Sequence, residues 1–228
     1  MKKIYVLLAA AALIAPAMSS AQKMTVTNIS KEKTYKKSTH NIDVWYQGEV
    51  NLGYAVSGKC KLDDEGDIEK FKTNYSRPLI ETVHGVRITK YAFVGVGAAV
   101  QYAFGKIYPD IEESDEKWNT LMIPLFFNLK GYYPVTDDFA PYISLSFGSS
   151  ICAMSSLNDS GSGYGYDYDD KLKGGFYSEY GIGFNYKRLN FGLGLQHQSM
   201  KLAWSESKYS GEEKWSINSF YVKLGLTF

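Results

Sequence analysis

A histidine and a serine two positions apart are the residues whose types and spacing best suit catalysis in this sequence. His197 and Ser199 come at the end of an alternating apolar segment. Residues i and i+2 of a β-strand point to the same face, so we expect both side chains on one face. A neutral imidazole can accept the proton of a hydroxyl group, and the resulting nucleophile can attack an ester. The pair therefore suggests an esterase as one hypothesis.

An acid that orients the imidazole would complete such a site. The candidates are Glu206, Glu212 and Glu213, and none of them is uniquely placed by its spacing. The alternative interpretation is that His197 and Ser199 only mark the edge where a strand enters a loop. Both interpretations stay open at this point.

In the strand-like segments, charged residues of both signs occupy the alternate positions that are predicted to point inward. They are Glu49, Glu81, Arg87, Lys130, Glu179 and Lys223. Charges inside a protein are tolerated when they pair with charges of opposite sign. We therefore predict a structural interior charge network, and a gated ion path is the functional alternative.

From Ile42 onward, the candidate residues lie on segments of about ten residues in which apolar and polar side chains alternate. The predicted strands are 42–56, 79–89, 92–104, 120–132, 142–153, 176–186, 189–199 and 215–228. Pro124 cannot donate a ladder hydrogen bond, so we expect a bulge or a local break there. Short turns alternate with long polar connections, which include the predicted loops 58–77 and 155–174.

This pattern predicts an all-β fold, an eight-stranded antiparallel up-and-down transmembrane β-barrel with short periplasmic turns and long extracellular loops. Alternation alone also fits a soluble lipocalin-like barrel, whose apolar face points inward. The asymmetry of the connections and the aromatic residues near strand ends favour the membrane barrel. Inward glycines such as Gly95 and Gly181 suit an eight-stranded ring, whose interior holds side chains rather than a channel.

The N-terminus has the layout of a secretory signal peptide. Two lysines precede the apolar run 4–15, and small residues lead to Ala21, after which cleavage is expected. We therefore predict a signal peptide at 1–21, a flexible periplasmic N-terminal segment at 22–40 and the barrel at 41–228. This organisation predicts export to the bacterial outer membrane.

Composition narrows the remaining functions. The net charge is +1 and the aromatic residues are not interleaved with a basic stripe, so we expect no nucleic-acid binding. Three histidines and no CxxC motif give no basis for a metal site or a cofactor. Cys60 and Cys152 permit one disulfide in an oxidising compartment without establishing it. In the predicted layout their strands stand on opposite sides of the barrel.

The C-terminal stretch 221–228 alternates apolar residues and ends on an aromatic one, with Tyr221, Gly225 and Phe228 as its marks. It looks like the terminal signal that the barrel-assembly machinery reads. Together with the eight segments, it makes the chain resemble the small eight-stranded, OmpA-like outer-membrane β-barrel family. The resemblance implies insertion by that machinery and contact with outer-membrane lipid and lipopolysaccharide, and we expect a monomer.

The His197 and Ser199 pair is similar to that of lipid A deacylases, which are also eight-stranded barrels with a lipid-facing serine and histidine. That resemblance implies that Ser199 attacks an acyl ester and His197 accepts its proton. Met200 departs from the pattern, because that family carries asparagine after the serine. We expect a non-enzymatic protein, structural or surface-interacting through its long loops. A lipid A-modifying esterase and a narrow gated channel are the alternatives.

Overall fold

The computed structural model describes residues 23–25, 43–64, 67–72, 75–106, 117–156, 159–163, 166–206 and 209–228. Its long strands are β2 (Asp43–Asp64), β4 (Ser76–Ile88), β5 (Ala92–Lys106), β6 (Lys117–Tyr132), β7 (Phe139–Ser155), β9 (Tyr166–Tyr186), β10 (Leu189–Glu206) and β11 (Tyr209–Thr227). Its short strands are β1 (Lys23–Thr25), β3 (Asp67–Lys72) and β8 (Asp159–Gly163). The predicted signal peptide and most of the predicted N-terminal segment lie outside the described residues.

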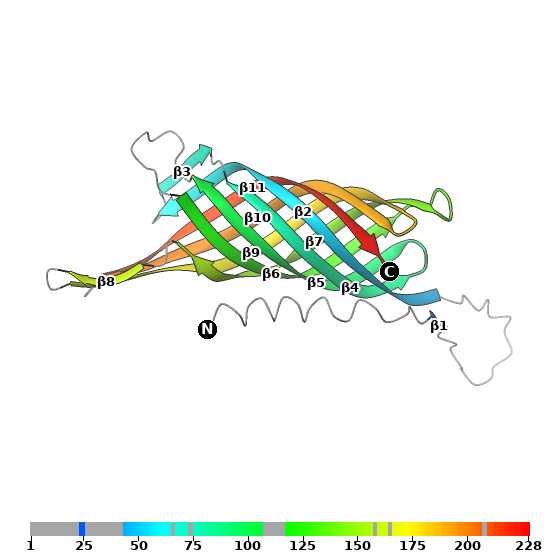
Figure 1. The fold of residues 1–228 in the computed structure, drawn as a ribbon, viewed down its shortest axis with the longest axis horizontal. Coiled ribbons are helices and arrows are strands. Elements are labelled where there is room, and N and C mark those ends of the chain that lie inside the picture. The colour runs from blue at the N-terminus through cyan, green and yellow to red at the C-terminus, as the bar shows by residue number, and fades with distance from the viewer. Residues whose placement is uncertain are drawn as a thin grey trace.

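The eight long strands close into one antiparallel barrel, as the sequence predicts (Figure 1). Each long strand pairs with the next one along the chain, and β2 pairs with both β4 and β11. At the end of this seam, the amide of Phe228 donates to the carbonyl of Gly48 at 2.9 Å, and the amide of Gly48 donates back at 2.8 Å. No helix in the described ranges is long and apolar enough to cross a membrane.

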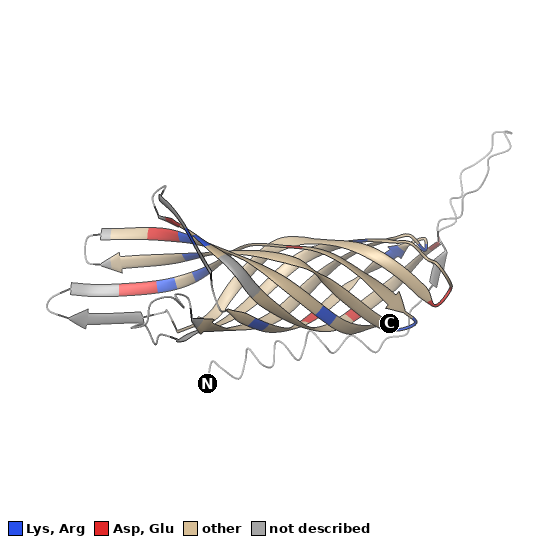
Figure 2. Cartoon of the chain, turned by 90° about the horizontal axis from the view of Figure 1, so that it is seen from above, with Lys and Arg blue, Asp and Glu red and all other residues tan. Residues whose placement is uncertain are grey.

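The strands extend past the segments that carry clear alternation, which corrects two predicted loops. The predicted loop 58–77 is mostly strand, because β2 runs on to Asp64 and pairs with β3. The predicted loop 155–174 contains β8 and the start of β9. Beyond the apolar belt the apolar side chains face inward, as Leu172 and Cys60 do, and bulges on β9 and β2 shift the period, so the predicted alternation is lost while the hydrogen-bond ladder continues. Figure 2 shows charged segments gathered on these extensions at one end.

Of two smaller expectations, the structure agrees with one and differs from the other. The ladder between β5 and β6 skips Ile123 and Pro124, so the expected local break is present, although β6 itself is continuous. A register shift lies nearby, where β7 carries Ala153 as an extra residue between the partners of Leu121 and Met122. The segment 22–40, predicted without folded elements, contains β1, which pairs with β2.

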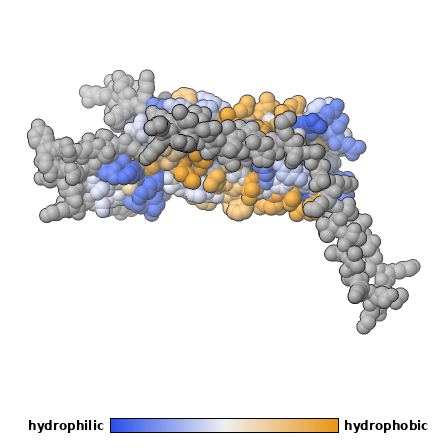
Figure 3. Space-filling model, turned by 60° about the horizontal axis from the view of Figure 1, so that its bottom comes forward, coloured by the Kyte–Doolittle hydropathy of each residue, from blue (hydrophilic) through white to orange (hydrophobic). Residues whose placement is uncertain are grey.

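The two faces of the wall have opposite character. Side chains such as Glu49 and Gln101 point inward and are 0% exposed. Outward side chains are apolar and exposed, and Leu52 at 62% and Ile143 at 67% are examples. Figure 3 shows hydrophobic side chains in the middle of the visible face, with hydrophilic residues toward both ends. The inward and outward parities are therefore those that the sequence predicts.

Large inward side chains occupy the space that glycines of nearby strands leave open. A Cβ on Gly181 would lie 2.1 Å from the hydroxyl oxygen of Tyr221. A Cβ on Gly97 would lie 2.5 Å from the ring of Phe126. An eight-stranded ring is only wide enough for side chains to fill, so these glycines set where the bulky residues fit.

The glycine packing predicts a position-specific loss of stability. In Gly194→Val, the new Cβ would lie 2.0 Å from the carbonyl oxygen of Tyr180 and 2.7 Å from the Cα of Gly181, so backbone must move. We expect the free energy of unfolding to fall by roughly 1–3 kcal/mol, measured by urea titration of the refolded barrel in lipid vesicles.

Gly131→Val is the matched control, since its Cβ would meet Ile143 at an ordinary 3.5 Å. We expect a change within about 0.5 kcal/mol for this surface position. Equal losses in both variants would contradict the packing argument.

Candidate functional site

The structure places His197 and Ser199 on the outer wall but gives each of them a different partner. His197 Nδ1 lies 2.8 Å from Asn218 Oδ1 on β11. The Ser199 hydroxyl accepts from the amide of Phe176 at 2.8 Å and donates to the carbonyl of the same residue at 3.4 Å. Within the described part of the chain, no hydrogen bond joins His197 to Ser199.

Ser199 also has a structural reason for its place in the sequence. On β9, Gly175 and Phe176 lie opposite this single residue of β10, because Gln198 pairs with Tyr177 and Met200 with Gly174. This is a β-bulge, in which one strand carries an extra residue. The Ser199 hydroxyl satisfies the amide of Phe176 that the bulge removes from the regular ladder.

The two candidate acids with described side chains, Glu212 and Glu213, bond other groups than the imidazole. Glu212 bonds Lys173 at 3.2 Å and Lys201 at 3.1 Å. Glu213 accepts from the indole nitrogen of Trp215 at 3.2 Å. The side chain of Glu206 lies outside the described residues. The geometry therefore does not assemble the nucleophile, base and acid that an esterase requires.

The structure brings most of the predicted interior charges together in two layers. In the first layer, Lys130 Nζ lies 2.5 Å from Glu49 Oε2. The same carboxylate accepts from Gln47 Nε2 at 3.0 Å and from Asn190 Nδ2 at 3.1 Å. The Lys130 ammonium also lies 4.6 Å from the centre of the Tyr142 ring. A buried ion pair is stable when such extra donors satisfy its remaining oxygens.

In the second layer, one lysine neutralises two carboxylates. Lys223 Nζ lies 2.5 Å from Glu81 Oε2 and 2.6 Å from Glu179 Oε2. Asn51 donates to Glu81 at 3.0 Å, and the Tyr177 hydroxyl donates to Glu179 at 2.6 Å. Each carboxylate thus has both an ammonium and a neutral donor.

The remaining predicted charge, Arg87, lies outside this pairing pattern. Its Nη1 donates to Gln47 Oε1 at 3.1 Å and its Nη2 donates to the carbonyl of Lys90 at 2.9 Å. The guanidinium carbon lies 3.7 Å from the centre of the Tyr132 ring, which is a cation–π contact. Arg87 therefore joins the network through neutral groups.

Sequence reasoning did not find Arg77, which is 1% exposed. Its guanidinium donates to the Gln198 side-chain oxygen and to the Ser219 hydroxyl. Arg77 continues the inward parity of Leu79 and Glu81, so the signal was present. It was hidden because the predicted strand began at Leu79 while β4 begins at Ser76.

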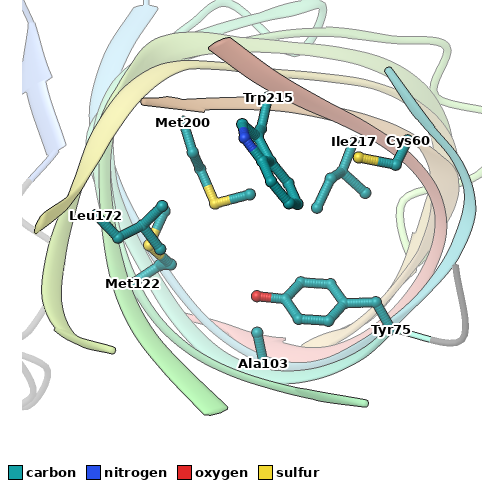
Figure 4. Close-up of a cluster of buried hydrophobic side chains, with 8 residues drawn as sticks. All are labelled: Cys60, Tyr75, Ala103, Met122, Leu172, Met200, Trp215 and Ile217. Carbon is teal, nitrogen blue, oxygen red and sulfur yellow. The ribbon is translucent and has the colours of Figure 1, made fainter. Parts of the chain in front are cut away.

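An apolar layer lies beyond the charges, toward the end that carries β3 and β8. Its buried residues are Cys60, Tyr75, Ala103, Met122, Leu172, Met200, Trp215 and Ile217. Figure 4 shows these side chains pointing from the wall into the ring. Cys152 packs against this layer, and both it and Cys60 are free thiols in the structure.

A further polar group, around His84, lies on the outer wall, and the sequence predicts this histidine to be a strand residue with a polar neighbour. His84 Nδ1 lies 2.5 Å from the Tyr46 hydroxyl, and its Nε2 lies 2.8 Å from the Thr82 hydroxyl. The Phe228 ring packs edge-on against the imidazole at 6.3 Å between centres. These contacts satisfy the imidazole without a carboxylate, so the group is best explained as support for the seam.

The ion-pair layers predict that Lys223 stabilises the barrel mainly by neutralising its partners. Lys223→Met leaves Glu81 and Glu179 buried without a counter-charge, and we expect the free energy of unfolding to fall by roughly 3–5 kcal/mol. Adding Glu81→Gln and Glu179→Gln removes those charges and should recover most of the loss. Urea titration of the refolded variants measures both effects.

Lys187→Met is the control, because the exposed Lys187 lies 3.9 Å from the exposed Asp138. A surface pair of this kind contributes at most about 1 kcal/mol. If the triple variant were as unstable as Lys223→Met alone, packing rather than charge would explain the loss.

Comparisons with known proteins give structural likeness only. No family model matches the chain, and no curated protein matches it in sequence. Among solved structures, the chain is similar to the solid-state NMR structure of outer membrane protein AlkL in DMPC bilayers, at 12% identity and a TM-score of 0.45, over 88% of this chain and 96% of that one.

Two further solved structures are more distant. Ail, the attachment invasion locus protein of Yersinia pestis, is 10% identical with a TM-score of 0.28, over 80% of this chain and 98% of that one. The P. putida toluene transporter TodX is 9% identical with a TM-score of 0.20, over 80% of this chain and 89% of that one.

Proposed function

We propose that this chain is a non-enzymatic outer-membrane β-barrel protein whose strand extensions contact the cell surroundings. The observation that carries the proposal is the inverted wall, with apolar side chains outside and paired polar side chains inside a sheet without a free edge. In hydrocarbon every backbone polar group must be bonded within the protein, and a closed barrel meets that demand. A soluble barrel would leave the outer apolar belt in water.

The orientation of the barrel in the membrane is inferred from the connections between its strands. Phe228 lies at the end of the barrel that carries the described short turns 89–91, 133–138 and 187–188. The strand extensions project from the opposite end of the barrel. Outer-membrane barrels have short periplasmic turns and longer extracellular connections. We therefore assign the end with β3 and β8 to the cell surface, where its exposed charged residues are available for recognition.

The two alternatives have less support. An esterase needs His197 to turn from Asn218 and Ser199 to leave the bulge, and no candidate acid with a described side chain meets the imidazole. A channel needs a path through both ion-pair layers and the apolar layer. A structural role in which loops carry any recognition requires none of these rearrangements.

Membrane insertion predicts a cost for charge on the outer wall. Leu195 is 61% exposed and lies within the apolar belt. In a bilayer, Leu195→Arg is expected to destabilise the barrel by roughly 1–3 kcal/mol, since Leu195 lies in the first apolar row, between the midplane, where arginine costs about 2–4 kcal/mol, and the interface, where it costs about 0–1 kcal/mol. Urea titration in lipid vesicles measures the change, and heat-modifiable gel mobility reports whether the barrel has formed.

Tyr133→Arg is the control, because Tyr133 is 74% exposed in a turn outside the belt. Its stability should change by less than about 1 kcal/mol. If Leu195→Arg were equally harmless, or if the native protein fractionated as a soluble periplasmic protein, the membrane proposal would be wrong.

The filled interior predicts that the barrel does not conduct ions. Planar-bilayer recordings of the refolded protein should show no reproducible current steps, since an eight-stranded interior is occupied by side chains. Steps of constant size from independently purified samples would instead support the gated-channel alternative.

A further inference from the structure

Three lysines form a row across the outer wall at the rim of the apolar belt. Lys173 on β9 is the register partner of Lys201 on β10, and Lys201 is the partner of Lys214 on β11. Register partners on adjacent strands point to the same face, with Cβ atoms about 5 Å apart. All of these residues lie on the outward parity, and the ammonium groups therefore lie side by side outside the barrel.

The protein itself balances this charge only in part. Glu212 is shared between Lys173 and Lys201, at 3.2 Å and 3.1 Å. Hydrogen bonds from Lys201 and Lys173 lower the pKa of the Glu212 carboxyl, so it stays ionised. Asp63 on β2 is the register partner of Lys214 and lies on the same face, but among the described residues no ion pair joins Lys214 to a carboxylate. Like charges directly opposite each other destabilise a sheet, and in the described part of the wall three ammonium groups face only the carboxylates of Glu212 and Asp63, so the row keeps a positive charge that a further anion would neutralise.

The rows between the lysines and the belt are uncharged on these strands and rich in hydrogen-bonding groups. Directly below the lysines, Ser199 pairs with Ser216, and below them His197 pairs with Asn218. The next row is apolar, where Leu195 lies between Tyr180 and Phe220. The face thus changes from apolar to hydroxyl and amide groups and then to cations within six residues of β10, roughly 20 Å of strand.

This order matches the layers of a lipid that carries phosphate on a sugar headgroup. Acyl chains contact apolar side chains, ester and sugar oxygens bond hydroxyl and amide groups, and phosphates bind ammonium groups. Lysine side chains at a membrane edge also extend toward the headgroup region while their stems stay on apolar surface. A peptide partner would have no comparable reason to require the apolar rows beneath the cations.

We propose that Lys173, Lys201 and Lys214 bind the phosphate groups of a phosphorylated glycolipid of the outer leaflet, with the sugar over the serine and histidine rows. The inference rests on the proposed function, because it needs the β3 and β8 end at the cell surface. It also gives His197 and Ser199 a role as neighbours of the headgroup, without any reaction.

Lipid binding to the refolded full barrel tests this inference. Diphosphorylated lipid A, its dephosphorylated form and phosphatidylglycerol are titrated separately, and native mass spectrometry counts the bound lipid. We expect lipid A to bind more tightly than the other two lipids. The triple variant Lys173→Gln, Lys201→Gln, Lys214→Gln should bind it on the order of 100-fold more weakly, from about 1 kcal/mol per lysine.

The matched control removes as many cations at the opposite end, as Lys90→Gln, Lys187→Gln, Arg188→Gln. Its affinity for lipid A should stay within a factor of about two, since these residues lie at the turns.

Wild-type affinity in the lysine-row variant, or equal binding of the dephosphorylated lipid or phosphatidylglycerol, would overturn the inference. Heat-modifiable mobility and vesicle insertion are measured on every sample. Failure of insertion would refute the proposed function, whereas an inserted barrel without selective binding refutes the glycolipid site alone.

Discussion

Closure of the sheet between β2 and β11 is the constraint on which the rest of the structure depends. A sheet with a free edge leaves a row of amides and carbonyls unbonded, and hydrocarbon offers them no partner. The register from Lys214 opposite Asp63 to Thr227 opposite Glu49 removes that edge, and the Phe228 and Gly48 bonds end it. Once the wall is closed, every second residue must face outward and the others must share a narrow interior.

The interior meets that demand with glycines and paired charges. Glycines such as Gly181 leave space for Tyr221, and the ring then places Lys223 between Glu81 and Glu179. Charges in so narrow a space need partners at hydrogen-bond distance, and the neutral donors around each carboxylate supply the remaining bonds. The same compact network that makes the polar interior tolerable also closes the path along the axis.

Alternation predicted the strands and their faces because neighbouring residues lie on opposite faces of the wall, one apolar and exposed and the other buried in the interior. It could not predict the strand extensions, since past the belt the apolar side chains face inward and bulges on β2 and β9 break the period, and Arg77 was hidden because β4 begins at Ser76, before the predicted strand. Parity also gives the direction of a side chain but not the height at which it meets a partner across the ring. That is why Lys223 and its two carboxylates could be grouped but not paired, and why Arg87 was grouped with them although neutral groups hold it.

The bulges near the rim connect the apolar layer to the lysine row. On β9, Tyr177 and Glu179 point inward, so an uninterrupted strand would also turn Lys173 inward. The extra residue at Gly175 and Phe176 reverses the parity, and Leu172 then faces the interior while Lys173 faces outward. On β2, Gly58 is an extra residue between the partners of Asn218 and Ser219, and it likewise turns Cys60 inward.

A bulge reverses the direction of all side chains beyond it on the strand. The residue inserted in β9 thus both adds Leu172 to the apolar layer and exposes Lys173 on the outer wall, so the apolar layer and the proposed lipid contact have a common origin in the backbone.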